Sequence, residues 1–347
     1  MNVAIICPYD LGMPGGVQDQ AERLVGWLES AGHDATLIGP GTSGPEGSVL
    51  LGSTMVIPAN KSAVPVAIDP RVARKVKEAV AEADVVHIHE PLMPVVSLAA
   101  TRIKEKPTVG TFHADASGAT RAGLRLGKPL VRLVASRLDV ITAVSPVAES
   151  TVDWLPDIRI IPNGVDLSDY SAAAKTDGSV LFLGRDDPRK GLDVILEAWP
   201  QVLARHPTAH LNVVGAERPD IIDGVEFLGR VSGEEKYRIL SESSVYVAPN
   251  LGGESFGIVV AEGMASGCAV VASALPAFAR VLGDAGRMVA PGDAEGLGEA
   301  VGDLLNDTAM RTELAEAALK RVERFDGSKV AAAYIDAYED AIIRHGA

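Results

Sequence analysis

The feature that most constrains this fold is the regular alternation of short, almost entirely apolar runs with longer segments of helical character. Runs of this length, rich in Val and Ile, are typical of strands that helices cover on both faces of a sheet. Strands that alternate with helices predict βαβ units and therefore a parallel sheet with right-handed crossovers. The predicted strands of the first half are Val3–Cys7, Ala35–Gly39, Val85–His89, Thr108–His113, Val140–Val144 and Ile158–Ile161, with helices near 17–30, 70–83, 92–104, 119–137 and 146–154.

The same alternation occurs a second time further along the chain, without any repeat at the level of individual residues. The predicted strands here are Val180–Leu183, Leu211–Val214, Val225–Leu228, Val245–Ala248 and Ala269–Ala272, with helices near 191–205, 233–242, 257–266, 276–283, 293–305 and 307–323. A stretch without periodicity, 168–178, separates the two series and is the predicted linker. The sequence therefore predicts an α/β protein of two doubly wound domains, 1–170 and 178–325, followed by a last helix over 328–345.

Composition excludes several classes of protein. The chain has 347 residues and a net charge of −14, which argues against general nucleic-acid binding. Cys7 and Cys268 are its only cysteines, too few for a disulfide framework or a cysteine-based structural zinc site, and they favour a reducing, cytoplasmic compartment. We find no apolar run long enough for a membrane-spanning helix, and the N-terminus has the character of a buried strand and not of a signal peptide.

The segment Pro14-Gly15-Gly16-Val17 follows the first predicted strand at the start of a helix. Two glycines allow a phosphate to approach the backbone, and the free N–H groups of a helix start favour an anion. The dinucleotide fingerprint Gly-x-Gly-x-x-Gly is absent, which disfavours an NAD-dependent oxidoreductase. A phosphate site and a plain strand-to-helix turn remain equally good interpretations of this segment alone.

Two charged motifs follow strands of the second half. Arg185 and Lys190 lie five residues apart in a turn that leads into a helix, where a guanidinium fork and an ammonium group can bind a diphosphate without a metal ion. Glu254 and Glu262 lie on either side of a helix start, and a carboxylate such as Glu262 can accept hydrogen bonds from the two hydroxyls of a ribose. The alternatives are a solvated charge cluster and unrelated glutamates, and the glycines and Phe256 beside Glu254 favour function.

Histidines occur at the ends of two strands of the first half. His113 ends the predicted strand 108–113, where the edge of a parallel sheet opens toward ligands, although a buried structural histidine is the commoner case. His87 and His89 alternate along a neighbouring strand, but no third ligand with suitable spacing and no His-Glu-x-x-His helix is visible. We therefore expect structural or supporting roles for His87 and His89 and no metal site.

Taken together, these motifs resemble the retaining glycosyltransferases of family 4, which have the GT-B fold of two Rossmann-like domains facing across a cleft. Within this family the sequence looks most like the actinobacterial enzymes that transfer mannose from GDP-mannose to the inositol ring of phosphatidylinositol. The resemblance covers essentially the whole chain. It is carried by Cys7-Pro8-Tyr9, Pro14-Gly15-Gly16-Val17, His87-Ile88-His89-Glu90-Pro91, Thr111-Phe112-His113, Ile161-Pro162-Asn163-Gly164-Val165-Asp166, the segment 185–191 and the segment from Gly252 to Glu262.

The resemblance implies a role for each matching residue. The donor-binding residues would be Gly16, Arg185, Lys190, Val231, Glu254, Phe256, Gly257 and Glu262. The acceptor-binding residues would be Tyr9, Gln18, Asn60 and His113, and the catalytic residues would be His113 and Glu254. The resemblance further implies a GDP-mannose co-substrate, no metal or other cofactor, a last helix that crosses back to the first domain, and closure of the two domains during catalysis.

The sequence departs from this pattern at the acceptor side. Cations that the lipid-modifying enzymes place for an inositol phosphate are replaced by Pro65, Ala67 and Gly118. The acceptor is therefore expected to be phosphatidylinositol with a substitute cation such as Lys61 or Arg121, or else an acceptor without a phosphate there. A nucleotide-sugar epimerase or hydrolase and a non-catalytic binding subunit are the other functions considered, the last disfavoured because His113 and Glu254 are both present.

A basic zone is expected to contact the membrane. Residues 71–137 contain 12 basic and 6 acidic side chains in an otherwise acidic chain. Two predicted helices, around Arg71–Val80 and Arg121–Leu133, combine cations with apolar residues, a pattern that suits the surface of an anionic membrane. Solvated helix faces explain the charge pattern equally well. The expected location is the cytoplasmic face of the cell membrane, with peripheral attachment.

Overall fold

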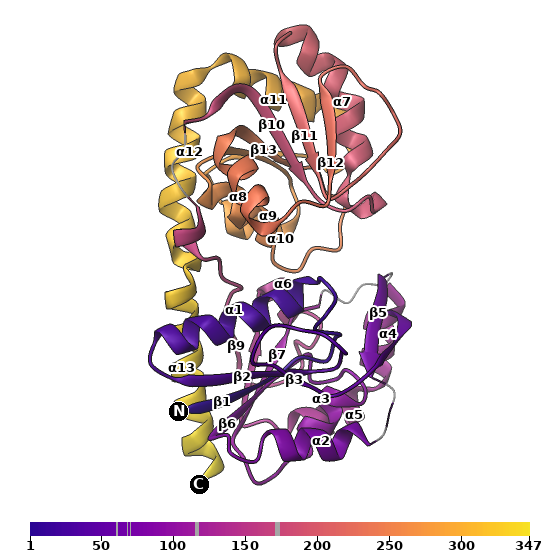
Figure 1. Cartoon of the computed structure of the whole chain (residues 1–347), viewed down its shortest axis with the longest axis vertical. Coiled ribbons are helices and arrows are strands. Elements are labelled where there is room, and N and C mark those ends of the chain that lie inside the picture. Colours follow the sequence, from indigo (N-terminus) through magenta and orange to yellow (C-terminus); the bar gives the residue numbers. More distant parts are fainter. Residues whose placement is uncertain (60–61, 68, 70, 115–117, 171–173) are drawn as a thin grey trace. The chain divides into compact units, whose positions relative to one another are not determined.

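The computed structural model describes all residues except 60–61, 68, 70, 115–117 and 171–173. It divides into two units, one formed by residues 1–164 and 327–347 and the other by residues 165–326 (Figure 1). The chain leaves the first unit several residues earlier than the predicted linker at 168–178. The reason is that Val165 already donates its backbone N–H to Phe325 of the second unit, at 2.9 Å, and that strand β10 (Thr176–Leu183) begins inside the predicted linker.

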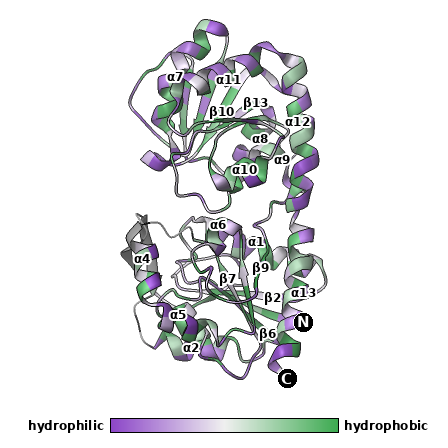
Figure 2. Cartoon of the chain, turned by 180° about the vertical axis from the view of Figure 1, so that it is seen from behind, coloured by the Kyte–Doolittle hydropathy of each residue, from purple (hydrophilic) through white to green (hydrophobic). Residues whose placement is uncertain are grey.

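The described part of the first unit contains a parallel sheet of seven strands in the order β3-β2-β1-β6-β7-β8-β9. Its central strands are buried and largely apolar, apart from the histidines of β6 and the threonines of β7, which is the pattern of a sheet with helices on both faces (Figure 2). The strands are β1 (Asn2–Ile6), β2 (Asp34–Gly39), β3 (Val49–Leu50), β6 (Val85–His89), β7 (Thr108–Phe112), β8 (Val140–Ala143) and β9 (Ile158–Ile160). A separate antiparallel hairpin is formed by β4 (Thr54–Ala59) and β5 (Ser62–Ala67).

The helices of the first unit include one from the far end of the chain. They are α1 (Gly16–Ser30), α2 (Val72–Ala79), α3 (Val96–Ala100), α4 (Gly118–Leu126), α5 (Lys128–Ala135), α6 (Pro146–Glu149) and α13 (Gly327–His345). The buried residues of α13 recur at helical spacing, and they pack in the same core as the strands β1, β6 and β7. Tyr334 and Tyr338 are the largest of them. The last helix is therefore an integral part of the first unit.

Two glycines of the first unit border the points where the chain leaves and returns. Gly164 and Gly327 both lie against the indole ring of Trp27 in α1. A Cβ atom would lie 2.6 Å from Cη2 of this ring at Gly164 and 2.2 Å from its Nε1 at Gly327. Gln20 binds the same segment, accepting the N–H of Gly164 at 2.8 Å and donating to its carbonyl oxygen at 3.1 Å. Side chains at either glycine would displace the ring.

The described part of the second unit contains a parallel sheet of six strands in the order β12-β11-β10-β13-β14-β15. Besides β10, its strands are β11 (His210–Val214), β12 (Val225–Gly229), β13 (Ser243–Ala248), β14 (Ala269–Ser273) and β15 (Arg287–Val289). The helices are α7 (Leu192–Arg205), α8 (Gly233–Glu242), α9 (Ile258–Ala265), α10 (Pro276–Leu282), α11 (Ala294–Asn306) and α12 (Thr308–Val322). Trp199 of α7 lies in the core between the sheet and α11.

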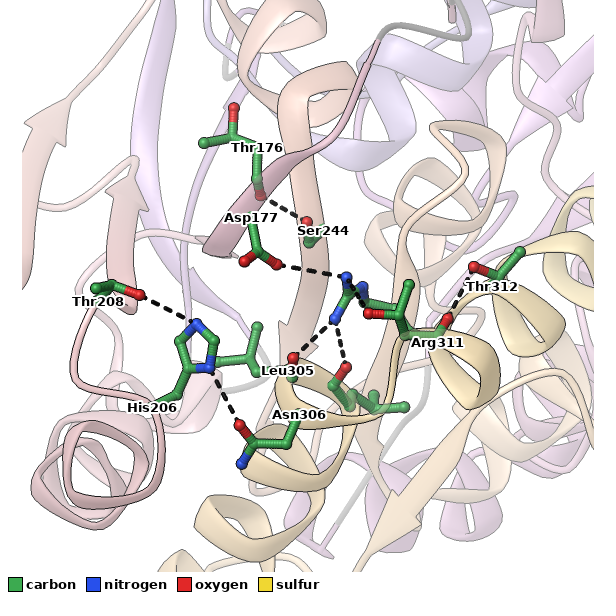
Figure 3. A network of polar contacts seen from close by, with 11 residues as sticks. Thr176, Asp177, His206, Thr208, Ser244, Leu305, Asn306, Arg311 and Thr312 are labelled. Atoms are coloured by element: carbon green, nitrogen blue, oxygen red, sulfur yellow. Dashed lines mark hydrogen bonds and ion pairs between the residues drawn. The ribbon is translucent and has the colours of Figure 1, made fainter.

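Arg311 fixes the turn between the two last helices of the second unit. Its guanidinium donates to the carbonyl oxygens of Leu304 and Leu305, at 2.8 and 2.9 Å, and it pairs with Asp177 of β10 at 3.4 Å (Figure 3). These carbonyls belong to the last turn of α11, which has no partner for them inside the helix. A cation at this end of a helix is also favoured by the helix dipole. The contact joins α11, α12 and the start of β10.

Candidate active site

The segment 184–191 after β10 forms a tight turn, in which Arg189 has a carboxylate partner and Arg185 has none among the described residues. Asp187 accepts the backbone N–H of Arg189 at 3.0 Å and forms an ion pair with its guanidinium at 2.7 Å. Arg185 is exposed, and no side chain of the described residues forms a hydrogen bond or an ion pair with it. Arg189 therefore stabilises the turn, whereas Arg185 is available for an anionic ligand.

Gly191 closes this turn and begins α7. Its φ is +72°, and a Cβ atom would lie 1.9 Å from the carbonyl oxygen of Pro249. Only glycine fits such a left-handed position so close to another backbone. The close approach brings the turn beside the loop that follows β13, where Leu251 donates its N–H to the carbonyl oxygen of Arg189 at 2.8 Å.

Lys190 and Glu254, predicted separately, lie together in the structure. The ammonium group of Lys190 forms an ion pair with the Glu254 carboxylate, and both side chains are mostly buried. Asn250 donates to the same carboxylate oxygen at 2.8 Å. A lysine that would bind a diphosphate and a glutamate that would contact the transferred sugar thus form one cluster. Nucleotide binding at Lys190 would compete with the Glu254 carboxylate for the ammonium protons.

The start of α9 is surrounded by three phenylalanines and capped by a glycine. Gly257 has φ +101° and caps the helix, and a Cβ atom there would lie 2.6 Å from the ring of Phe278. Phe256 is buried and packs edge-on against Phe325, with ring centroids 5.3 Å apart. The backbone amides of Phe256 and Gly257, two of the predicted donor-binding residues, therefore lie at a helix N-terminus, which is a favourable place for negative charge.

Glu262 lies in the buried face of α9 with two partners from other segments. Its carboxylate accepts from Lys236 of α8 at 2.9 Å and from the hydroxyl of Tyr170 at 3.4 Å. Lys236 and Tyr170 were not predicted, because nothing in the sequence connects them to Glu262. Val231 is half-buried in the loop between β12 and α8. Since Lys236 lies near the start of α8, this loop and the Glu262 carboxylate belong to the same side of the second unit.

In the first unit, the predicted glycine lies at the start of α1. The helix begins at Gly16, and a Cβ atom there would meet no other atom within 4 Å. Gln18 folds back over the preceding loop and donates to the carbonyl oxygens of Asp10 and Met13, both at 3.3 Å. Tyr9 is largely buried, and this burial together with the nearby Glu90 raises its pKa well above the usual value. The remaining acceptor residue predicted, Asn60, lies outside the described residues, as does Lys61.

His113 follows β7, and the Glu90 carboxylate fixes its backbone. The backbone N–H groups of His113 and Ala114 donate to one carboxylate oxygen of Glu90, at 2.8 and 2.7 Å. Glu90 itself has φ +47°, an uncommon conformation for a residue other than glycine, and is 8% exposed. Burial raises the pKa of the Glu90 carboxyl to about 7, although the two amides stabilise its ionised form.

The ring of His113 belongs to a buried column of three histidines. Its Nε2 lies 2.7 Å from Nδ1 of His89, and the His89 ring stacks on His87 with centroids 4.4 Å apart. His87 is bonded at both nitrogens, to the Tyr338 hydroxyl at 2.8 Å and to Thr111 at 2.6 Å. Burial lowers the pKa of His87 and of His113 to about 3, and that of His89 well below its usual value, so all three are neutral at neutral pH.

Within the described residues, no group of three or more His, Cys, Asp and Glu side chains is arranged to hold a metal ion. A cavity of about 10 Å³, near the lower limit for one water molecule, lies beside His89 and His113.

Comparisons with known proteins agree with this architecture. The family model "Glycosyltransferase Family 4" matches residues 14–169, and "Glycosyl transferases group 1" matches residues 177–307. The chain is 38% identical to the phosphatidyl-myo-inositol mannosyltransferase of Mycolicibacterium smegmatis, over 98% of this chain and 94% of that protein. The chain belongs to glycosyltransferase family 4. This glycosyltransferase is also 37% identical to a protein of the same name from Propionibacterium freudenreichii, with 82% and 80% of the two chains covered.

Solved structures show that this glycosyltransferase has the GT-B fold predicted from the sequence. HepE from Anabaena, in complex with UDP and glucose, superposes with a TM-score of 0.77 at 18% identity, covering 98% of this chain and 99% of that one. Sucrose-phosphate synthase from Thermosynechococcus elongatus superposes with a TM-score of 0.73 at 21% identity, covering 97% and 98%. At these identities the likeness concerns the fold alone.

Proposed function

We propose that this glycosyltransferase transfers mannose from GDP-mannose to the inositol ring of phosphatidylinositol, with retention of the anomeric configuration. The observation that carries the proposal is the 38% identity to a phosphatidyl-myo-inositol mannosyltransferase over almost the full length of both chains. A match of this extent spans both units, the one expected to bind the donor and the one expected to bind the acceptor.

The second unit supports a nucleotide-diphosphate donor. Arg185 has no side-chain partner among the described residues, and Lys190 lies beside Glu254 at the start of α9. A guanidinium, an ammonium and a helix N-terminus can together neutralise a diphosphate without a divalent ion. The Glu254 carboxylate, held by Asn250, is then placed to accept hydrogen bonds from sugar hydroxyls.

The first unit supports a polyhydroxylated acceptor less specifically. His113 is a neutral imidazole with no partner on its Nδ1 among the described residues, which suits a hydroxyl group. The positions expected to bind the inositol phosphate lack charge in this sequence, namely Pro65, Ala67 and Gly118. This departure favours, as the second candidate, transfer of the same sugar to a lipid or inositol-like acceptor without a phosphate at that point.

Donor and acceptor are tested together with radiolabelled nucleotide sugars. GDP-mannose, UDP-glucose and UDP-N-acetylglucosamine are each incubated with phosphatidylinositol, free inositol or a diacylglycerol, with and without EDTA. We expect label only in the product of GDP-mannose and phosphatidylinositol, unaffected by EDTA, and an α-anomer by NMR. Label in another acceptor alone would overturn the lipid assignment, and release of free or epimerised sugar without acceptor would indicate a hydrolase or epimerase.

We further propose that the enzyme binds an anionic membrane peripherally, through the face formed by α4 and α5. No helix among the described residues is long and apolar enough to span a bilayer. Leu126, Leu130 and Leu133 are 86%, 66% and 53% exposed. Arg125 and Arg132 lie among them, and no carboxylate of the described residues pairs with either. Exposed leucines beside unpaired cations fit the boundary between headgroups and acyl chains.

The other basic helix, α2, is less suited to this role. Val72 and Val76 of α2 are buried in the first unit and leave no apolar side for a membrane. Its arginines are paired with carboxylates, Arg71 with Asp69 at 3.1 Å and Arg74 with Glu78 at 3.3 Å. Of the two basic helical segments, the one around α4 and α5 therefore carries the proposal of membrane contact.

A further inference from the structure

The contact between His89 and His113 determines which nitrogen of His113 can meet a ligand. Nε2 of His113 is occupied by Nδ1 of His89 at 2.7 Å, and both rings are almost completely buried. The Glu90 carboxylate accepts the backbone N–H groups of His113 and of the next residue, Ala114, and so fixes the backbone at this point. Only Nδ1 of His113 remains without a partner among the described residues, so the ring can address a ligand only through this atom.

The surroundings of Nε2 of His89 determine which of the two rings donates the hydrogen bond between them. One neutral ring must donate and the other accept, so their tautomers are linked. Nε2 of His89 is buried and has no hydrogen-bond partner in the described part of the chain. A buried N–H without a partner is costly, and it is rarer in proteins than a buried acceptor without one. Nε2 of His89 is therefore the bare nitrogen, and Nδ1 of His89 carries the proton and donates it.

We propose that His89 is a positioning residue that fixes His113 in the tautomer with its proton on Nδ1, so that His113 meets its ligand as a hydrogen-bond donor. This inference rests on the proposed function in that the ligand is a hydroxyl oxygen of the sugar or of the acceptor. In this tautomer Nδ1 has no lone pair, and His113 is not the base that removes a proton from the acceptor. The role of His113 is to orient an oxygen atom.

Support for the His89 ring comes from the rest of the column. His89 stacks on His87, which is bonded to Tyr338 of α13 and to Thr111 of β7. Because His87 is held at both nitrogens, its ring gives the His89 ring a fixed surface. The orientation of His113 is in this way connected to the last helix of the chain.

The tautomers are measured directly by NMR on protein labelled with ¹⁵N-histidine, in which protonated and bare ring nitrogens resonate in separate regions. Signals are assigned by their loss in His89→Phe and His113→Gln variants. We expect Nδ1 protonated and Nε2 bare in both His89 and His113. A protonated Nε2 on His113 would overturn the proposal. This measurement needs no substrate, so a wrong acceptor assignment leaves it valid and fails separately.

Kinetics of three variants test the positioning role. His89→Phe keeps the ring volume and removes the hydrogen bond, and we expect kcat to fall roughly tenfold or more, as for a lost hydrogen bond at a reacting group. His89→Asn offers an amide N–H near the place of Nδ1 and should restore most of kcat. Tyr338→Phe removes a hydroxyl one step further along the same column and should lower kcat less than His89→Phe, because Thr111 still holds His87.

GDP affinity, measured by calorimetry, should be the same in all three variants, since no residue of the column lies in the second unit. A His89→Phe variant with native kcat and a native His113 spectrum would overturn the proposal.

Discussion

Glu90 is a carboxylate in an environment that opposes its ionisation. The pKa of about 7 lies above the usual 4.5, so the folded protein holds a proton between these values that the unfolded chain has lost. The contribution of Glu90 to the folding stability is therefore fully present below pH 4.5 and is lost as the pH rises through 7. Glu90→Gln keeps an oxygen for the amides of His113 and Ala114 without ionising. We expect this variant to gain stability relative to the native protein as the pH rises, by on the order of 2–3 kcal/mol between pH 4.5 and 8.

Urea unfolding at several pH values measures this difference. The three buried histidines act in the opposite direction, because their lowered pKa values make stability fall as the pH drops below 6.5. They are present in both proteins, so their effect cancels in the difference. Glu46→Gln, at an exposed glutamate, is the control and should give a difference that does not depend on pH. A flat difference for Glu90→Gln as well would show that Glu90 ionises normally.

Arg185 and Lys190, the two residues predicted to bind the diphosphate, differ in their surroundings. Lys190 lies in a cluster with Glu254 and Asn250, whereas Arg185 does not. Lys190→Ala removes a cation and leaves the Glu254 carboxylate near the phosphates, whereas Arg185→Ala removes a cation alone. We expect each variant to weaken GDP binding by about 1.5–3 kcal/mol, with the larger loss in Lys190→Ala. Adding Glu254→Gln to Lys190→Ala should recover part of the affinity.

Calorimetry with GDP distinguishes these cases. Arg238→Ala is the matched control, since Arg238 pairs on the surface of α8 with Glu235 and Glu242 and should not influence the nucleotide. Native affinity in both Arg185→Ala and Lys190→Ala would remove these residues from the donor site.

The face proposed to contact the membrane is formed by two helices, because its exposed leucines come from both α4 and α5. Replacing Leu126, Leu130 and Leu133 by Ser removes apolar side chains that the protein itself leaves exposed, so we expect little change in folding stability. Binding to anionic vesicles should weaken by about 1 kcal/mol per leucine, or on the order of a hundredfold in all, because each is partly buried in the bilayer. Vesicle flotation with and without phosphatidylglycerol measures the effect.

Two further variants serve as controls for vesicle binding. Ile221→Ser replaces an apolar residue of the second unit that is as exposed as any of these leucines, and it should not change vesicle binding. Arg71→Glu at α2 should also leave it largely unchanged, because Arg71 is already paired with Asp69. Loss of binding on changing α2 with none on changing the leucines would assign the membrane contact to α2.

Most strands and helices with a clear apolar period were predicted to within a few residues, and β6 and α8 at their observed bounds. The helices predicted over 92–104 and 146–154 are much shorter in the structure, as α3 and α6, and the short strands β3 and β15 were not predicted. The hairpin β4–β5 was missed, since prolines at 58 and 65 interrupt its pattern. The single helix expected over 119–137 is divided at Gly127, with Pro129 in the first turn of the second part. Residues such as Lys190 and Glu254 were found because glycine-rich turns mark them. Asn250, Lys236 and the contact of His89 with His113 could not be predicted, because they depend on how distant segments pack.

The second unit is, in its connections, an insertion between Gly164 and Gly327 of the first. Its two ends are paired, since Val165 donates to Phe325 and forms a bridge with Asp326. We expect a fragment of residues 165–326 to fold alone and to bind GDP, though more weakly than the whole protein, because it lacks the donor-binding residue Gly16 of the first unit. A chain that ends at Asp326 lacks α13 and should leave the first unit unable to complete its core, because Tyr334, Ala337 and Tyr338 are buried there.

Circular dichroism, proteolysis and calorimetry on the two truncated chains test this division. Protease should degrade the first unit of the chain that ends at Asp326 and spare its second unit. A fragment 165–326 that does not fold, or a stable first unit without α13, would contradict it.

The position of α13 also sets an order of events during synthesis. The strands of the first unit leave the ribosome early, but α13, whose tyrosines contact His87 and Thr111 of these strands, is made only after the whole second unit. At about 5–20 residues per second, the first unit waits roughly 10–40 s for its final element. The second unit, whose ends meet each other, has all its parts beforehand. We therefore expect the first unit to complete its core only after the second unit has been made, with the face that α13 covers exposed until then.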